Sequence, residues 1–126
     1  MFTHMTVGSN DLEKSKTFYD AIFEAMGANP GFIDPKGRAV YVHKRAMFLV
    51  TKPIDDQPAT FGNGATIGLS TDSPEQTDAW HAAGLEAGGM AIEDPPGWRE
   101  SNGMRLYLAY LRDPDGNKLC ALHRPT

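Results

Sequence analysis

Residues 4–27 of the chain read HMTVGSNDLEKSKTFYDAIFEAMG, and residues 66–89 read TIGLSTDSPEQTDAWHAAGLEAGG. When the second stretch is laid on the first without a gap, more positions are identical than the roughly one or two that average composition would give. The identical pairs are Glu13 and Glu75, Ala21 and Ala83, Glu24 and Glu86, Ala25 and Ala87, and Gly27 and Gly89. The match predicts that one domain, residues 1–126, contains two copies of a structural unit, at about residues 1–54 and about residues 64–126.

Both copies are expected to begin with a strand and a helix. Residues 3–8 alternate between polar and apolar side chains, which predicts a strand. Asn10 is predicted to be the N-cap of the first helix and Gly27 to end it. In the second copy Ser73 is the predicted N-cap, and Pro74 suits the first helical position.

Shorter strands are predicted after each helix. They are residues 31–34, 38–43 and 46–51 in the first copy, and residues 90–93, 105–111 and 117–123 in the second. A two-residue turn at Lys44-Arg45 would place Tyr41 opposite Phe48. Residues 94–104 are rich in proline and glycine and are predicted to form a loop long enough to cover a site.

The sequence Asp113-Pro-Asp-Gly116 predicts the turn before the last strand. Proline suits the second turn position, and glycine tolerates a positive φ. A four-residue turn here would place Ala109 opposite Cys120 and Tyr107 opposite Leu122.

Composition limits the possible partners. The chain has 126 residues, 40% of them hydrophobic, which is the size of a single globular domain. Its net charge of −4 argues against a nucleic-acid partner. We expect neither a secretion signal nor a membrane span, because there is no charged leader and no long apolar run. A single cysteine fits a reducing compartment, so a cytoplasmic location is expected.

Two βαβββ units with Asp113-Pro-Asp-Gly-Asn117 before the last strand resemble the vicinal oxygen chelate superfamily, which includes glyoxalase I, bleomycin-resistance proteins and extradiol dioxygenases. The opening stretch His4–Tyr19 and the Gly62-Asn-Gly64 step are also similar to that family. The resemblance covers essentially the whole chain. It implies an α+β fold in which two tandem βαβββ modules form a cupped sheet around a pocket, and it implies a homodimer.

In that family, His, Gln or Glu side chains on the first and last strands hold a divalent metal such as Zn, Mn, Fe or Ni, which binds two adjacent substrate oxygens. The matching positions here are His4, Thr66, Phe48 and Cys120. Only His4 is a strong ligand, so the resemblance implies a degraded metal site, and no cofactor is expected. The alternative is that His4, Cys120 and a further histidine such as His43 hold zinc.

The predicted ligand-binding residues come from strand alternation, from the resemblance and from the loop at 94–104. They are His4, Tyr41, Phe48, Thr66, Trp98, Arg105, Tyr107 and Cys120. The alternative for the aromatic and basic members is a structural role as a loop anchor, a strand filler or a solvated charge. Glu100 as a base and Cys120 as a nucleophile are candidate catalytic residues, against the alternatives of an isolated loop carboxylate and a small buried apolar side chain.

Three functions stay open. The first is a binding protein that holds a small organic ligand between aromatic walls, and the acidic balance would suit a planar ligand, cationic ones included. The second is a metal-dependent lyase, isomerase or dioxygenase acting on a small oxygenated substrate. Lactoylglutathione lyase activity is not expected, because the four-ligand pattern is missing. The third is a metal-free enzyme that uses Glu100, His43 or Cys120.

Overall fold

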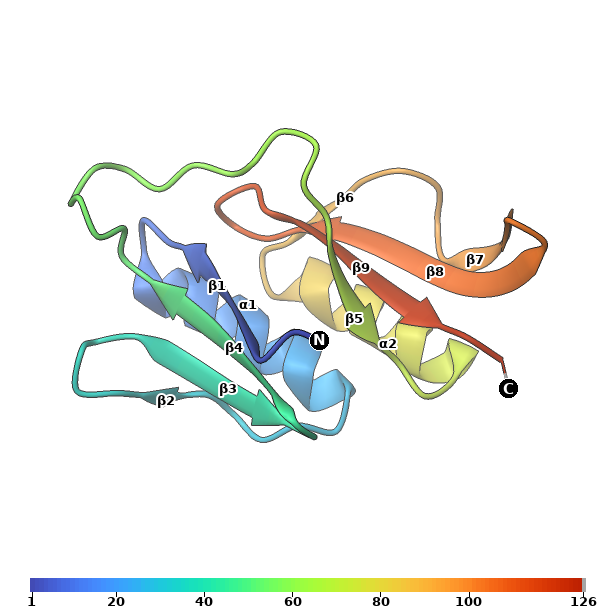
Figure 1. Cartoon of the computed structure of the whole chain (residues 1–126), viewed down its shortest axis with the longest axis horizontal. Helices are drawn as coiled ribbons and strands as arrows, with labels where there is room; N and C mark the ends of the chain where they lie inside the picture. Colours follow the sequence, from blue (N-terminus) through green and yellow to red (C-terminus); the bar gives the residue numbers. More distant parts are fainter. Residues whose placement is uncertain (126) are drawn as a thin grey trace.

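The computed structural model describes residues 1–125, and its elements fall into two similar halves (Figure 1). The first half contains β1 (His4–Gly8), α1 (Leu12–Ala25), β2 (Phe32–Ile33), β3 (Ala39–His43) and β4 (Ala46–Thr51). The second half contains β5 (Ile67–Ser70), α2 (Pro74–Glu86), β6 (Met90–Ala91), β7 (Gly97–Ser101), β8 (Met104–Arg112) and β9 (Lys118–His123). Figure 1 shows both helices on the same side of the two sheets.

The two sheets have the same strand order, which confirms the predicted α+β fold of two tandem units. The first sheet runs β1-β4-β3-β2 and the second runs β5-β9-β8-β6. In each sheet the first strand of the half pairs in parallel with the last strand. As a result, β1 and β5 each lie at an edge of their own sheet.

The first helix begins one residue later than predicted. Asp11 is the N-cap, and its carboxylate accepts a hydrogen bond from the Lys14 N–H at 3.1 Å. The Asn10 side chain is instead used by the connection between the halves, because it donates to the Ala59 carbonyl at 3.1 Å and accepts from the Ala59 N–H at 2.7 Å. A distant backbone segment therefore takes the amide that the sequence suggested as the cap.

The second helix begins as predicted. Ser73 accepts from the Gln76 N–H at 3.0 Å, and Pro74 is the first helical residue. The Gln76 side chain accepts from the N–H of Asp72, the residue before the cap.

A buried pair of hydroxyl groups repeats at the start of each helix. Ser9 Oγ lies 2.5 Å from Ser15 Oγ, and Thr71 Oγ1 lies 2.6 Å from Thr77 Oγ1. The two pairs occupy equivalent places in the aligned repeats. Since buried hydroxyl groups need partners, the pair satisfies the same requirement in both copies.

Two predictions for the second half are wrong. Part of the predicted loop at 94–104 forms β7, which pairs with β8 in a hairpin. The β8–β9 register differs by one residue from the prediction, because Arg112 pairs with Lys118 and five residues lie between them instead of four. Tyr110 therefore pairs with Cys120, and a one-residue shift moves side chains to the other face of the sheet.

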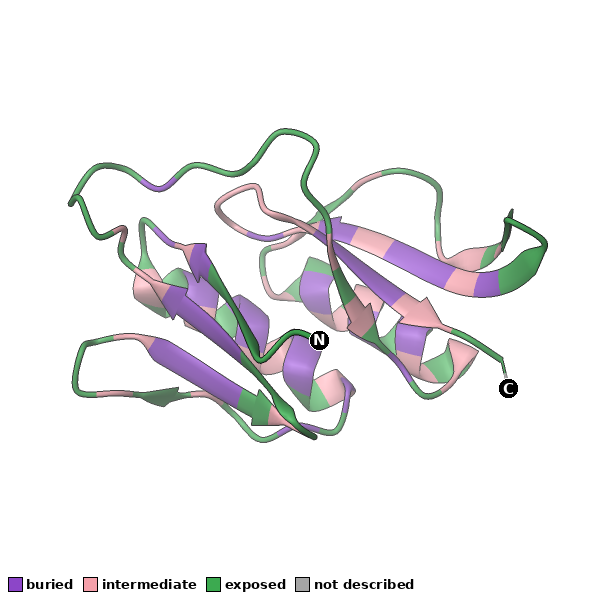
Figure 2. Cartoon of the chain, viewed as in Figure 1, coloured by how far each residue is buried: buried purple, intermediate pink, exposed green. Residues whose placement is uncertain are grey.

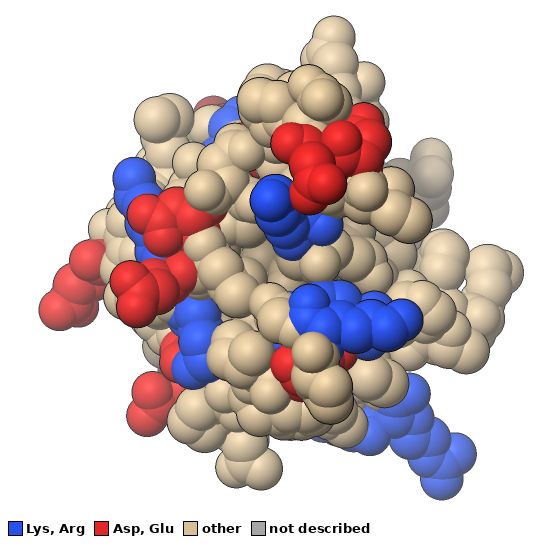
Figure 3. Space-filling view, turned by 90° about the vertical axis from the view of Figure 1, so that its left-hand side faces the viewer, with Lys and Arg blue, Asp and Glu red and all other residues tan. Residues whose placement is uncertain are grey.

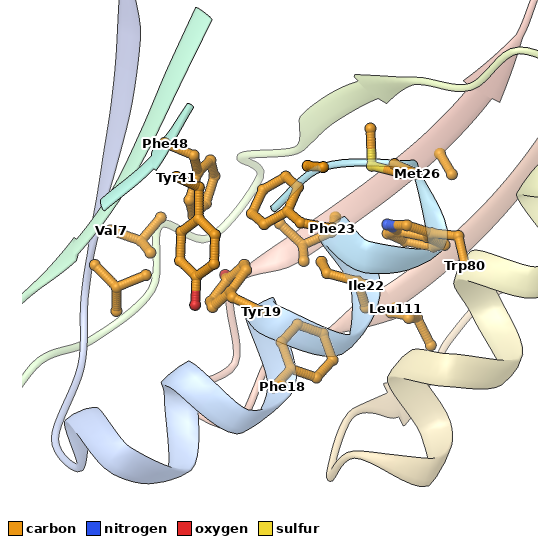
Figure 4. Packing of buried hydrophobic residues seen from close by; sticks show 14 of the residues in the cluster. Val7, Phe18, Tyr19, Ile22, Phe23, Met26, Tyr41, Phe48, Trp80 and Leu111 are labelled. Atoms are coloured by element: carbon orange, nitrogen blue, oxygen red, sulfur yellow. The ribbon is translucent and has the colours of Figure 1, made fainter. Parts of the chain in front are cut away.

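The core lies between the helices and the sheet faces that they cover (Figures 2 and 4). Trp80, Phe18, Tyr19 and Ile22 have no exposed surface. Gly84 allows this close packing of α1, α2 and β8, since a Cβ on it would collide with the Leu111 side chain and lie 3.1 Å from Ile22 Cγ2.

Hydrogen bonds at the β8–β9 turn join the two halves. Tyr19 of α1 donates to Asp113 Oδ2 at 2.5 Å, and the Asp113 carboxylate also accepts from the Asn117 side chain and from the N–H groups of Asp115 and Asn117. Burial raises the pKa of Tyr19 well above its usual range, and the nearby carboxylates raise it further. The Tyr19 hydroxyl therefore stays protonated and donates.

Asp115 makes a second set of bonds from the same turn to the first half. Its Oδ1 accepts from the Asn10 N–H at 3.0 Å, and its Oδ2 accepts from Ser15 Oγ at 3.0 Å. A carboxylate beside the first turn of α1 also interacts favourably with the helix dipole.

The connection between the halves crosses the surface and contacts both of them (Figure 2). Besides the Asn10–Ala59 pair, the Phe61 ring covers Gly116, and the Arg112 guanidinium lies 5.0 Å from that ring's centroid. Figure 3, which views the molecule from the left-hand side of Figure 1, shows basic and acidic side chains next to one another. Neither helix within residues 1–125 is long and apolar enough to cross a membrane.

We predict that Gly84→Ala destabilises the protein although alanine is the better helix former, because the added methyl has no room. We expect a loss of about 1–3 kcal/mol, the usual effect of overpacking, measured by urea unfolding. The matched control is Gly68→Ala, where the added Cβ meets nothing within 4 Å. Equal stability of the two variants would contradict this account of the helix contact.

We predict that Tyr19→Phe costs about 1.5–3 kcal/mol, because a buried carboxylate loses a donor. The control is Tyr107→Phe, which removes a 2.7 Å bond to Asp78 at an exposed position and should cost under about 1 kcal/mol. Similar losses of unfolding free energy in the two variants would show that burial of the Tyr19–Asp113 pair is unimportant.

Candidate functional site

A pocket of about 420 Å³ lies between the two halves, along the free edges of β1 and β5. α1 and the β3–β4 hairpin supply the rest of its wall. The lining residues are Phe2, His4, Met5, Phe23, Met26, Tyr41, His43, Lys44, Arg45, Ala46, Met47, Phe48, Ile67, Gly68, Leu69 and Ser70. The pocket therefore exists only when the two halves are docked.

Apolar and aromatic side chains form the inner wall of the pocket, and Figure 4 shows Phe23, Tyr41 and Phe48 packed together in the core. Phe23 lies in the last turn of α1, Met26 is the C-cap that follows this helix, and both are buried. The Phe23 ring lies 4.8 Å from the Tyr41 ring and 5.4 Å from the Phe48 ring, centroid to centroid. Packed aromatic rings give a rigid apolar surface that can take part of a ligand out of water.

Tyr41 is held in this wall by Asp20 of α1. Its hydroxyl donates to Asp20 Oδ1 at 2.7 Å, and the same carboxylate accepts from the Gly31 N–H at 3.0 Å and from Lys16 Nζ at 2.8 Å. Partial burial would raise the pKa of the Asp20 carboxyl, but these hydrogen bonds outweigh it and hold that pKa below its usual range. Burial, with the hydrogen bond to Asp20, raises the pKa of Tyr41, so its hydroxyl remains the donor.

Basic side chains lie at the mouth of the pocket. Lys44 and Arg45 form the turn between β3 and β4, and Lys44 Nζ pairs with Asp72 Oδ1 at 3.0 Å. This ion pair joins the first half to the second. His4 Nδ1 lies 2.8 Å from Thr3 Oγ1 on the neighbouring residue.

Three of the predicted ligand-binding residues meet at this pocket, namely His4, Tyr41 and Phe48. The pairing of Tyr41 with Phe48 is confirmed. Tyr41 and Phe48 do not share a sheet face with His4, because Phe48 pairs with Met5, whereas His4 pairs with Met47 in the parallel β1–β4 ladder. Thr66 lies directly before β5, is exposed and does not line the pocket.

Cys120 lies apart from the pocket, on the face of the second sheet that the helices do not cover. It is buried with Leu106 and Leu108, and its thiol contacts the Ala121 carbonyl at 3.7 Å. Burial raises the pKa of this thiol. A thiol with a raised pKa is a poor nucleophile at neutral pH, so the environment fits the alternative of a small buried apolar side chain.

The remaining predicted residues gather at the outer end of β7 and β8. The Trp98 and Tyr107 rings lie 5.2 Å apart, edge to face, and the Arg105 guanidinium lies 4.3 Å from the Trp98 ring's centroid. Tyr107 faces α2, because its hydroxyl donates to Asp78. The carboxylate of Glu100, on β7, is exposed there. Arg105 and Trp98 line a separate hollow, so the structure divides the predicted set between two places.

The donors of one chain do not fit the divalent metal that the resemblance implies. Across residues 1–125, no three His, Cys, Asp or Glu side chains lie close enough together to hold an ion. His4 contacts a threonine hydroxyl, while Thr66 and Cys120 stand away from the pocket. A catalytic zinc needs about three protein donors, so we derive no chemical step through a metal.

Sequence reasoning missed part of the pocket. Phe23, Met26 and Gly68 were not among the predicted site residues, and Lys44 and Arg45 were expected only to form a turn. Open space surrounds the position of the missing Cβ of Gly68. The basic turn was the available signal, because it sits beside a strand that carries a candidate ligand-binding tyrosine.

Comparisons with known proteins agree with this architecture. The family model of the Glyoxalase/Bleomycin resistance protein/Dioxygenase superfamily matches residues 2–121. The crystal structure of a glyoxalase/bleomycin resistance protein from Albidiferax ferrireducens T118 is 55% identical, covers 98% of this chain and 99% of that chain, and has a TM-score of 0.95. No curated protein sequence matches the chain.

More distant solved structures show the same fold. A glyoxalase/bleomycin resistance protein/dioxygenase family enzyme from Burkholderia phytofirmans PsJN is 16% identical, with 98% of each chain covered and a TM-score of 0.74. A glyoxalase-related enzyme from Fulvimarina pelagi is 20% identical over 99% of this chain and 88% of that chain, with a TM-score of 0.72.

We predict that Asp20→Asn destabilises the protein at pH 7 by about 0.5–1 kcal/mol, because a partly exposed ion pair and a charge-assisted hydrogen bond are lost. A carboxyl with a lowered folded-state pKa stabilises the fold above its unfolded pKa and loses that contribution as the pH falls through the folded value. The difference from wild type should therefore shrink as the pH falls below about 4, the unfolded pKa, and disappear once the pH lies below the lowered pKa of the folded state. Urea unfolding at pH 7, 5 and 3 measures this difference in the free energy of unfolding. The control is Glu24→Gln on the exposed side of α1. An undiminished difference at pH 3 would contradict the assignment.

Proposed function

Because the chain belongs to the glyoxalase/bleomycin resistance protein/dioxygenase superfamily, we propose that it binds a small organic molecule in the pocket between β1 and β5. Proteins of one fold carry out different chemistry, so the argument for function comes from the pocket. The observation that carries the proposal is an apolar, aromatic cavity of about 420 Å³ formed at the junction of the two halves.

Size and lining both support binding of a small molecule. Ligand pockets usually enclose about 300–1,000 Å³ and combine an apolar wall with a few polar groups. Here Phe23, Met26, Tyr41 and Phe48 provide the wall, and the polar groups lie at the mouth. The hydrogen bond from Tyr41 to Asp20 keeps one ring in place before a ligand arrives, which lowers the entropic cost of binding.

The arrangement of the His, Cys, Asp and Glu side chains supports ligand binding without a metal held by the protein. The alternative of a metal-dependent lyase, isomerase or dioxygenase needs donors that one chain does not bring together within residues 1–125. Glu100 lies outside the pocket lining, and Cys120 is buried elsewhere, so neither supports a metal-free reaction in the pocket.

The homodimer and the cytoplasmic location remain predictions. On β4, Met47 is 41% exposed, whereas Leu49 is only 6% exposed. The other exposed large apolar side chains of the first sheet are Met5, Phe32, Ile33 and Val42. Light scattering that gives a monomer mass would remove the dimer from the proposal.

We predict that naphthalene-2-carboxamide, a neutral aromatic probe, binds the purified protein. A ligand of this size gains at least about 4 kcal/mol in a good pocket, which is a Kd of about 1 mM or tighter. Gly68→Leu should weaken binding at least about tenfold, because its side chain enters the open space at Gly68 and takes up ligand volume. Calorimetric titration after EDTA treatment measures both.

The control variant is Gly68→Ala, which adds only one methyl group at the same site. It should keep most of the affinity, and both variants should unfold at temperatures close to that of wild type. Failure of the probe to bind, or equal affinity in wild type and Gly68→Leu, would contradict the proposed pocket. Loss of binding on EDTA treatment, restored by Zn²⁺, would favour the metal-dependent alternative.

A further inference from the structure

We propose that the molecule bound in this pocket is an anion with an apolar body, and that Arg45 binds its anionic group. The inference deepens the proposed function and rests on it. It concerns the sign of the ligand's charge and the residue that recognises that charge.

The charged side chains that line the pocket are all basic. They are Lys44 and Arg45, with His4 and His43 beside them, and the lining contains no aspartate or glutamate. The carboxylate of Asp72 near the mouth is paired with Lys44 at 3.0 Å. Local charge at the mouth is therefore positive, although the chain as a whole carries −4.

Arg45 is the cation that remains available. Within residues 1–125 it forms no ion pair, whereas Lys44 is held by Asp72. Arg45 is exposed and follows Lys44 in a two-residue turn between paired strands, with His43 opposite Ala46. The turn fixes the backbone at the mouth while the long side chain stays free to reach a ligand.

The chemistry of the two ends defines the ligand class. A guanidinium offers a planar set of donors that matches a carboxylate or a phosphate with two parallel hydrogen bonds. The inner wall of Phe23, Met26, Tyr41 and Phe48 suits an aromatic or aliphatic body. A ligand with an apolar body and a single anionic group satisfies both ends.

This assignment reverses the charge preference expected from composition. Net charge and aromatic content suggested a pocket for planar ligands, cationic ones included. Net charge describes the field far from the protein, but at contact distance the nearest charges dominate, because salt screens the others over about 8–10 Å.

The test compares three probes with the same naphthalene body: naphthalene-2-carboxylate, naphthalene-2-carboxamide and protonated 2-(aminomethyl)naphthalene. Calorimetry on the full chain should give the carboxylate an affinity at least about fivefold above that of the carboxamide, with the ammonium weakest. The preference should shrink as NaCl is raised from about 0.05 to about 0.5 M.

Arg45→Gln should abolish the preference for the carboxylate, measured as the ratio of the carboxylate affinity to the carboxamide affinity of the same variant. Arg45→Lys should keep part of the preference, because the charge remains but the two parallel donors are lost. The matched control is Arg124→Gln, which changes the net charge equally at an exposed position outside the pocket. Arg124→Gln should prefer the carboxylate over the carboxamide to the same extent as wild type.

Any other result of these titrations would overturn the anionic ligand, the role of Arg45 or the proposed function. Equal affinities of the three probes, or strongest binding of the ammonium, would overturn the anionic ligand and leave the proposed function standing. An equal loss of preference in Arg124→Gln would overturn the role of Arg45. Failure of all three probes to bind would overturn the proposed function and this inference with it.

Discussion

The buried carboxylate of Asp113 is the constraint on which the arrangement of the two halves depends. It is 4% exposed and accepts four hydrogen bonds, three from its own turn and one from Tyr19 of α1. A buried charge that lacks partners is very costly, so α1 must lie where its tyrosine can reach this turn. Asp115 adds bonds from the same turn to the start of α1. The position of the first helix is thereby fixed from the second half.

The pocket follows from this docking. α1 is 14 residues long, and its start is held by Asp115 and its middle by Asp113. Its last turns therefore lie beneath the gap between β1 and β5, where Phe23 and Met26 form the inner wall. The two sheets do not pair with each other, so their edges leave room between them. The site thus has an apolar wall that belongs to the core and a mouth whose charge depends on one short turn.

Much of the fold could be predicted from the sequence, because the helices and the β3–β4 pairing depend on hydrophobic periodicity and a short turn, which are local signals. The two-unit topology could be predicted because the pattern of the first half recurs in the second and resembles a known family. The errors have a different origin. The Asn10 amide was taken up by Ala59, about fifty residues away, and the β8–β9 turn contains one more residue than its Asp-Pro-Asp-Gly sequence suggested. The one-residue difference in the β8–β9 register places Tyr107 against α2. The pocket could not be predicted from any one segment, because residues of both halves line it.

The bonds of Asp115 also set an order of events during biosynthesis. Asp115, which accepts from the Asn10 N–H just before α1, lies 105 positions after Asn10. On the ribosome, the first half emerges well before its partner turn, and N-terminal segments begin to fold as they appear. Until the β8–β9 turn leaves the exit tunnel, the Tyr19 hydroxyl has only water as a partner, and the second half does not yet cover the apolar side of α1. Emergence of the β8–β9 turn is therefore the step at which the first helix gains these partners and the pocket between the halves can form.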